Sequence, residues 1–288
     1  MILPWWLLLV LLKSSPNVLP GAYDYTEPAR WREVFPMCGG PMQSPIALTP
    51  TRYALSRTPK LKFAKGLSDG QIEAVNTGRA LKLTLRPKNR DKPLLRLVSY
   101  SKPMIGIYTF AQMHFHWADG SGLHGSEHAI GGNYTDAEAH FVFYNSRYPS
   151  IKEAVRHFDG LLVVGTMLRG SEDKQQFLFP TVGMEDRLGD VLTPGKKLKV
   201  EADLRDFSWL LRRAVLRFYS YHGSLTTPPC NPVVTWMVAS TVFPVRDKFL
   251  KSLRKLHEND DSDGRLVHNC RPVQPTHGRV VTQHISVG

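Results

Sequence analysis

The chain has 288 residues, 42% of them hydrophobic, and a formal net charge of +12. This apolar content is enough for a large core, and glycines and prolines spread along the chain indicate many turns rather than a disordered tract. The basic residues are dispersed, with no zinc-finger spacing and no basic helix, so we expect a basic surface and no nucleic-acid binding.

The first twelve residues, MILPWWLLLVLL, form an apolar run that ends at Lys13. At about 1.5 Å per residue, such a helix is too short for a ~30 Å hydrocarbon core. The run predicts a secretory signal peptide over residues 1–21, although no basic residue precedes it. A buried N-terminal helix fits poorly because Pro4 and two adjacent tryptophans interrupt it. We therefore expect a secreted protein with one domain over residues 22–288 and no transmembrane segment in the mature chain; the oligomeric state stays open.

Short apolar or alternating runs, separated by turn-forming residues, follow in chain order. The predicted strands are 72–76, 81–85, 94–99, 106–117, 138–145, 160–168, 217–223 and 233–240. Helical candidates are 150–158, where Ser150 is a possible cap, 203–213, and 245–260, which has apolar residues at helical spacing. This pattern predicts a mixed, β-dominated single domain with a large sheet and peripheral helices.

The chain contains three cysteines, Cys38, Cys230 and Cys270. In a secreted protein this number predicts one disulfide and one remaining thiol, and spacing alone does not choose the pair. Asn133 begins an Asn-Tyr-Thr glycosylation sequon, which is consistent with an exposed loop in the secretory pathway.

Polar residues alternate with apolar ones in two of the predicted strands. In 106–117, Gln112, His114 and His116 share one face, and in 138–145, Glu138 and His140 share another. If these strands pair, three imidazoles converge in the outline of a zinc site with an open fourth position, typical of a catalytic site. Gln112 and Glu138 then lie where they can engage the second ring nitrogens of the ligands.

Taken alone, histidines of this kind are more often ordinary strand residues than ligands. The other histidines without such a partner, expected on the surface or hydrogen-bonded in the core, are His124, His128, His157, His257 and His277. The metal hypothesis therefore needs support from elsewhere in the chain.

Residues 113–145, MHFHWADGSGLHGSEHAIGGNYTDAEAHFVFYN, resemble the core signature of the α-class carbonic anhydrases. Further motifs of that family follow in order: QSPI (43–46), NTGRA (76–80), GSLTTPPC (223–230), VVTW (233–236) and NCRPVQP (269–275). The resemblance extends from about Tyr23 to the C-terminus. It implies a large, mostly antiparallel twisted central sheet with peripheral short helices, and a Zn2+ ion held by His114, His116 and His140.

The resemblance also implies the reaction: zinc-bound hydroxide hydrates carbon dioxide reversibly to bicarbonate and a proton. Thr226 corresponds to the threonine that accepts the hydroxide proton, and Glu127 to the glutamate that accepts the threonine proton. Thr227 matches a position that substrate passes, and Asn269 and Arg271 match residues that brace the site. The residues that match the apolar carbon dioxide wall are Val142, Val163, Leu225 and Trp236.

The same resemblance implies which two cysteines form the disulfide. Cys38 and Cys230 match the disulfide pair of extracellular family members, where the bridge steadies the Thr226 loop. Cys270 has no matching partner, so a buried free thiol and an intermolecular disulfide both stay open.

The chain departs from the family at the proton-shuttle position, where Arg79 replaces the histidine of fast members. Arginine stays protonated and cannot relay protons, so we predict an active enzyme limited by proton transfer. Thr77 and Lys82 replace nearby asparagines, and His222 is an alternative relay. The family tyrosine near the site could be Tyr23 or Tyr25.

A second hypothesis is a carbonic-anhydrase-like binding module with weak catalysis. Such relatives typically lack one or more of the zinc histidines, whereas this chain keeps all three together with Thr226 and Glu127. The enzyme is therefore the favoured prediction.

Overall fold

The computed structural model of the protein describes residues 23–87, 93–102, 104–173, 179–181, 183–259 and 264–287. The predicted signal peptide lies outside the described residues. Within these ranges, no helix combines the length and apolar character needed to cross a membrane.

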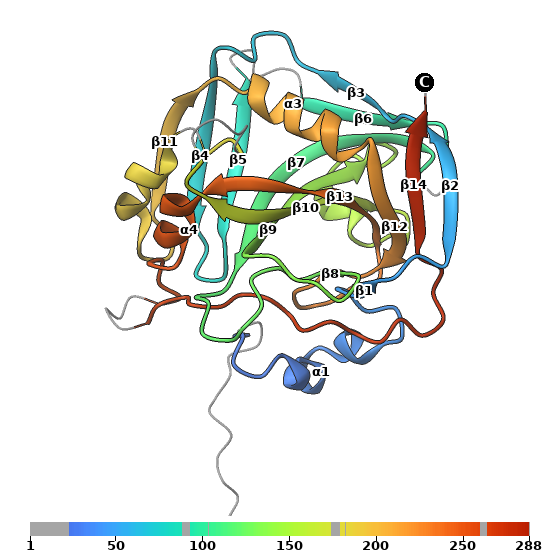
Figure 1. The fold of residues 1–288 in the computed structure, drawn as a ribbon, viewed down its shortest axis with the longest axis horizontal. Helices are drawn as coiled ribbons and strands as arrows, with labels where there is room; N and C mark the ends of the chain where they lie inside the picture. Colours follow the sequence, from blue (N-terminus) through green and yellow to red (C-terminus); the bar gives the residue numbers. More distant parts are fainter. Residues whose placement is uncertain are drawn as a thin grey trace, which may run out of the picture.

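A twelve-stranded sheet dominates the part of the chain that the structure describes (Figure 1). Its main path runs β11-β4-β5-β7-β9-β10-β13-β12-β14-β2, and β3 and β6 extend from β7. The strands are β1 (Ala47–Leu48), β2 (Arg52–Arg57), β3 (Lys60–Phe63), β4 (Gly70–Asn76), β5 (Leu81–Pro87), β6 (Leu95–Ser99), β7 (Gly106–Trp117), β8 (Ala129–Ile130), β9 (Ala137–Asn145), β10 (Leu161–Ser171), β11 (Lys197–Ala202), β12 (Arg217–Gly223), β13 (Val234–Arg246) and β14 (Thr282–Val287).

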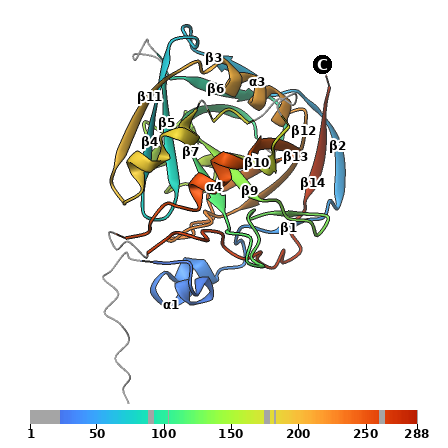
Figure 2. The same ribbon diagram turned by 60° about the vertical axis from the view of Figure 1, so that its left-hand side comes forward.

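Most strand pairs of this sheet are antiparallel, and β10–β13 and β14–β2 are parallel. The sheet curves so that β4 and β11 lie at one side of the molecule and β14 and β2 at the other (Figure 2). Strands at its centre, such as β9 and β10, are buried along most of their length, whereas β4 and β5 alternate between buried and more exposed residues. The predicted β-dominated mixed fold is confirmed.

The helices are short and lie at the periphery. They are α1 (Trp31–Val34), α2 (Ile151–Ala154), α3 (Arg205–Ala214) and α4 (Asp247–Leu253), with 3₁₀ turns at Pro28–Arg30, Pro36–Gly39, Met184–Asp186 and Leu188–Val191. The predicted cap of α2 is confirmed, because the Ser150 side chain accepts a hydrogen bond from the Glu153 backbone N–H.

Two predicted helices are shorter than expected. The helix predicted over 150–158 ends at Ala154, because the chain then turns back on the helix. Gly160 packs so closely against this last turn that a Cβ atom at residue 160 would lie 1.8 Å from the Ala154 carbonyl oxygen. The helix predicted over 245–260 begins only at Asp247, because β13 continues its pairing with β10 as far as Arg246, and it ends already at Leu253. Residue 260 lies outside the described residues.

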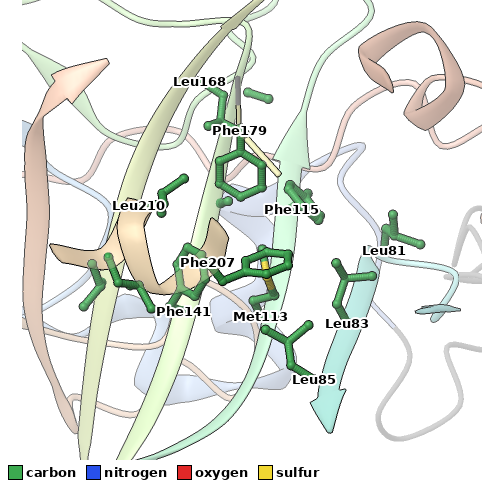
Figure 3. Close-up of a cluster of buried hydrophobic side chains, with 14 of the residues drawn as sticks. Leu81, Leu83, Leu85, Met113, Phe115, Phe141, Leu168, Phe179, Phe207 and Leu210 are labelled. Atoms are coloured by element: carbon green, nitrogen blue, oxygen red, sulfur yellow. The ribbon is translucent and has the colours of Figure 1, made fainter. Parts of the chain in front are cut away.

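The main core lies on one face of the central strands (Figure 3). Leucines 81, 83 and 85 of β5 meet Met113 and Phe115 of β7, and α3 contributes Phe207 and Leu210. Because successive strand residues point to opposite faces, a β7 strand that buries Met113 and Phe115 in this core directs its alternate residues, His114 and His116, to the other face.

Candidate metal centre

Strands β7 and β9 pair in a register that sets His114 directly opposite His140. His116 lies two residues along β7, on the same face as His114. The ring centroids of His114 and His116 are 5.1 Å apart, those of His114 and His140 5.2 Å, and those of His116 and His140 4.6 Å. One ring nitrogen from each histidine lies within 4.8 Å of the others, so the three can share one ion.

Each imidazole has one ring nitrogen engaged by an oxygen. The pairs are His114 Nδ1 with Gln112 Oε1 at 3.1 Å, His116 Nδ1 with the Asn269 backbone oxygen at 2.8 Å, and His140 Nε2 with Glu138 Oε1 at 2.7 Å. The other nitrogen of each ring is left for a ligand, and His116 Nε2 is buried with no hydrogen-bond partner. A metal ion satisfies these nitrogens, so the residues present fit zinc.

The electrostatics favour the protonation state that a metal requires. Burial lowers the pKa of all three imidazoles, that of His116 to about 4, and the neighbouring histidines lower the pKa of His114 and His140 further. The rings are therefore neutral near pH 7, which is the metal-binding form.

Glu138 is fully buried and accepts four hydrogen bonds. Oε2 accepts from the backbone N–H groups of Glu127 and His128, at 3.0 and 2.8 Å, and Oε1 faces the rings of His128 and His140, each at 2.7 Å. Burial acts to raise the pKa of this carboxyl, but the two imidazoles outweigh it and hold the pKa well below its usual range. A charged Glu138 orients the His140 ring.

A hydrogen-bond chain continues from Glu138 and was not predicted from the sequence. His128 Nε2 meets the Tyr221 hydroxyl at 2.7 Å, and that hydroxyl donates to Ser44 Oγ at 2.9 Å. His128 was expected on the surface or hydrogen-bonded in the core, and it is buried and hydrogen-bonded. Tyr221 lies 93 positions from His128 and 177 positions from Ser44, so only the fold brings these three residues together.

Glu127 is buried beside the three imidazoles. Its Oε1 accepts a hydrogen bond from the Arg271 backbone N–H at 3.0 Å. Burial raises the pKa of Glu127 to about 7, while His140 and the nearby Thr226 hydroxyl act to lower it. Glu127 Oε2 is left without a hydrogen bond of normal geometry, so the structure brings Thr226 close to Glu127 without closing that contact.

An apolar row lies next to the imidazoles. Val142 of β9, Val163 of β10 and Trp236 of β13 are direct cross-strand neighbours, and Leu225 packs against the same cluster. The Trp236 ring centroid is 4.9 Å from that of His140. The predicted wall residues therefore lie together beside the predicted ligands.

Arg79 lies close to the metal centre through Asn269, whose side-chain amide donates to the Arg79 backbone oxygen at 3.0 Å. The Nε of Arg79 donates to the Tyr23 carbonyl, its Nη1 donates to the Gly78 carbonyl at 2.8 Å, and its guanidinium lies 5.6 Å from the Tyr23 ring centroid. Glu258 approaches Nη1 at 3.8 Å. Arg79 is thus held by three neighbours.

Tyr23 and Tyr25 both lie near Glu127 of the site. The Tyr23 hydroxyl interacts with Thr227, although burial keeps its pKa raised overall. Lys82 of β5 pairs directly with His114, which adds a cation beside the imidazoles. The sequence left the choice between the two tyrosines open.

Other predicted residues lie elsewhere. The His222 ring stacks on Phe158 with centroids 3.7 Å apart, and Nε2 meets the Pro232 carbonyl at 3.1 Å. Asn133 is exposed in the turn after β8. Cys38 and Cys230 form a disulfide, and Cys270 is a buried free thiol.

The comparisons with known proteins agree with one another. The family model of the eukaryotic-type carbonic anhydrases matches residues 26–285. Carbonic anhydrase 3 of Bos taurus is 33% identical over 266 residues, which cover 91% of this chain and 96% of the relative. Carbonic anhydrase 12 of Homo sapiens is 32% identical over 292 residues, covering 96% of this chain and 77% of the relative.

Proposed function

This chain belongs to the eukaryotic-type carbonic anhydrase family, and from that membership we propose a secreted zinc enzyme that hydrates carbon dioxide reversibly and is limited by proton release. The observation that carries the proposal is the convergence of His114, His116 and His140, each with one ring nitrogen engaged and the other free. A catalytic zinc site has this arrangement of three neutral imidazoles.

Zinc held by these three residues would lower the pKa of water to about 7 and so make hydroxide available near neutral pH. Thr226 would then hold the proton of the nucleophile away from the substrate, and Glu127 would accept the Thr226 proton. Val142, Val163, Leu225 and Trp236 offer an apolar surface for carbon dioxide, a molecule without strong hydrogen-bonding groups.

Proton release is the proposed slow step. Arg79 keeps its protons and cannot accept another, so it cannot relay, and its contacts with Tyr23, Gly78 and Glu258 hold it in place. His222, the alternative relay, is engaged by Phe158 and Pro232. Buffer molecules would therefore carry the proton to solvent.

Secretion is the third part of the proposal. The apolar run at residues 1–12 supports it, and so does the disulfide between Cys38 and Cys230, because such bonds persist in oxidising compartments. The exposed position of Asn133 is compatible with glycosylation there.

Zinc analysis combined with stopped-flow carbon dioxide hydration tests the function. We expect one zinc per chain and a hydration rate at saturating substrate that rises with imidazole buffer concentration. Bound zinc without hydration would instead favour the binding module. A fast rate that is indifferent to buffer would contradict the proton-release step alone.

A further inference from the structure

A cavity of about 610 Å³ is lined in part by β12 and β13, the strands that carry Tyr221 and Trp236 near the metal centre. Trp236 of β13 and Tyr221 of β12 pack on the side of the metal-site imidazoles. Because strand residues alternate, their neighbours Thr235, Ser220 and His222 point to the opposite side and line the cavity, and Tyr221 itself also borders it. The volume is within the range of small-molecule sites.

Two deeply buried hydroxyl-bearing residues line this cavity. Tyr108 of β7 is 4% exposed and Thr235 is 7% exposed. Neither side-chain hydroxyl forms a hydrogen bond with another of the residues that the structure describes. Neither hydroxyl is among the buried, unpartnered side-chain atoms of the described residues, so both reach the open space of the cavity and are available to a ligand.

The cavity is positively charged. Arg52 of β2 and Lys102, in the loop before β7, line it, and neither forms an ion pair within the described part of the chain. Asp159 is the carboxylate among the described lining residues, and its charge is already engaged. Arg147 approaches one of its oxygens at 3.2 Å, and the Tyr148 hydroxyl donates to the other at 2.6 Å.

Apolar side chains complete the lining. Ile105 is 57% exposed and Val280 is 48% exposed, and Ala54 lies with them along the cavity. Exposed apolar surface beside unpaired cations favours a ligand that has both an anionic group and a hydrocarbon part. Strands β12, β14 and β2, which supply much of this wall, lie side by side in Figure 1.

We propose that this cavity binds a small organic oxyanion, a carboxylate or a phosphate ester. Arg52 and Lys102 pair with the anionic group, and the Tyr108 and Thr235 hydroxyls form hydrogen bonds with the ligand. This site is separate from the metal centre and does not depend on the proposed hydration reaction.

Calorimetric titration of the zinc-loaded chain with phenyl phosphate, benzoate and inorganic phosphate tests the proposal and distinguishes the two organic classes. We expect one of the organic anions to bind more tightly than inorganic phosphate. Arg52→Gln combined with Lys102→Gln should weaken that binding at least about tenfold, and Tyr108→Phe about fivefold. Thr235→Val, which keeps the side-chain shape, should act like Tyr108→Phe.

Arg57→Gln is the matched control, because Arg57 is exposed on the same strand as Arg52 and does not line the cavity. It should bind as the unmodified chain does. An oxyanion bound at the metal centre would keep its affinity in all the cavity variants, and that result would overturn the proposal. Equal binding of inorganic phosphate and both organic anions would also overturn it.

Discussion

Arg79 and Tyr23 are joined twice near the metal centre. The Arg79 Nε donates to the Tyr23 backbone carbonyl, and the guanidinium lies 5.6 Å from the centroid of the Tyr23 ring. A group that keeps its proton at every accessible pH, and is held in one position, can neither accept nor swing a proton outward. This relationship is the physical basis for expecting slow proton release.

Arg79→His should raise the turnover number at low buffer concentration, on the order of tenfold or more, because an imidazole at this position can accept and release protons. The ratio kcat/KM should change little, since it reports the steps before proton release. Stopped-flow hydration at low and high imidazole concentration measures both quantities. Arg79→Gln is the control, because it removes the charge without supplying a relay. An equal gain in both variants would show that charge, rather than proton relay, limits the rate.

Thr226→Val should lower kcat/KM on the order of a hundredfold with zinc content unchanged, because valine keeps the shape but cannot hold the proton of the nucleophile. Thr226→Ser retains the hydroxyl and should restore most of the activity. Hydration kinetics and zinc analysis on both variants measure the loss of activity and show whether zinc is retained. If the valine variant loses zinc in parallel with activity, the residue supports the metal site rather than the nucleophile.

Local periodicity predicted which histidines share a strand face, and the family resemblance supplied their role as ligands. Side chains alternate between the two faces of a strand, so His114 and His116 of segment 106–117 share one face, and His140 of segment 138–145 shares a face with Glu138. The pairing of β7 with β9 then brings the three histidines together. Residues whose role depends on distant contacts could not be predicted in this way. Ser44 and Tyr221 are 177 positions apart, and no local pattern connects them.

Three strands at or near the ends of the sheet's main path were also missed, for a physical reason. β2 and β11 have polar or mixed sequences with many exposed residues, and β14, which lies between β12 and β2, is mostly buried or half-buried. All three lack the apolar runs by which central strands are recognised. Their strand conformation is fixed by pairing with a neighbour, as in β14 with β12. Such pairing depends on which strand lies alongside in the folded protein, and the sequence of the segment alone does not indicate it.

Glu138→Gln should weaken zinc binding about ten- to a hundredfold. The amide lacks the charge that orients His140, and its NH₂ group would face the backbone N–H donors of Glu127 and His128 in place of an acceptor oxygen. Competition with a chelator of known affinity measures the change. Glu258→Gln is a carboxylate control beside Arg79, and its zinc affinity should stay at the wild-type value. Equal losses in both variants would contradict a specific role for Glu138.

The Cys38–Cys230 disulfide should stabilise the fold by about 2–5 kcal/mol, because it closes a long loop in the unfolded chain. The bridged residues are 192 positions apart. Replacing both cysteines by serine should lower the urea midpoint of unfolding. It should also reduce activity, since the Cys230 backbone N–H donates to the Thr227 carbonyl at 2.9 Å. Cys270→Ser serves as the control, because that thiol forms no disulfide and its loss should leave both measurements nearly unchanged.

His284 is buried between two strands and is in hydrogen-bond contact with two hydroxyls. Its Nδ1 lies 2.5 Å from Ser56 Oγ and its Nε2 2.7 Å from Ser220 Oγ, and the ring stacks on Phe218. Burial lowers the pKa of His284 below its ordinary value of 6.5. The folded chain therefore resists protonation of this ring.

Below pH 6.5 the unfolded chain binds a proton at His284 that the folded chain does not, so the free energy of unfolding should fall as the pH is lowered through this range. The contribution is fully present above pH 6.5. His284→Gln, which can donate to one serine and accept from the other, should flatten this slope by up to about 1.4 kcal/mol per pH unit. Urea unfolding of the zinc-loaded protein between about pH 5 and 8 measures it. His277→Asn, at an exposed histidine, should keep the wild-type slope, and an unchanged slope in His284→Gln would contradict the assignment.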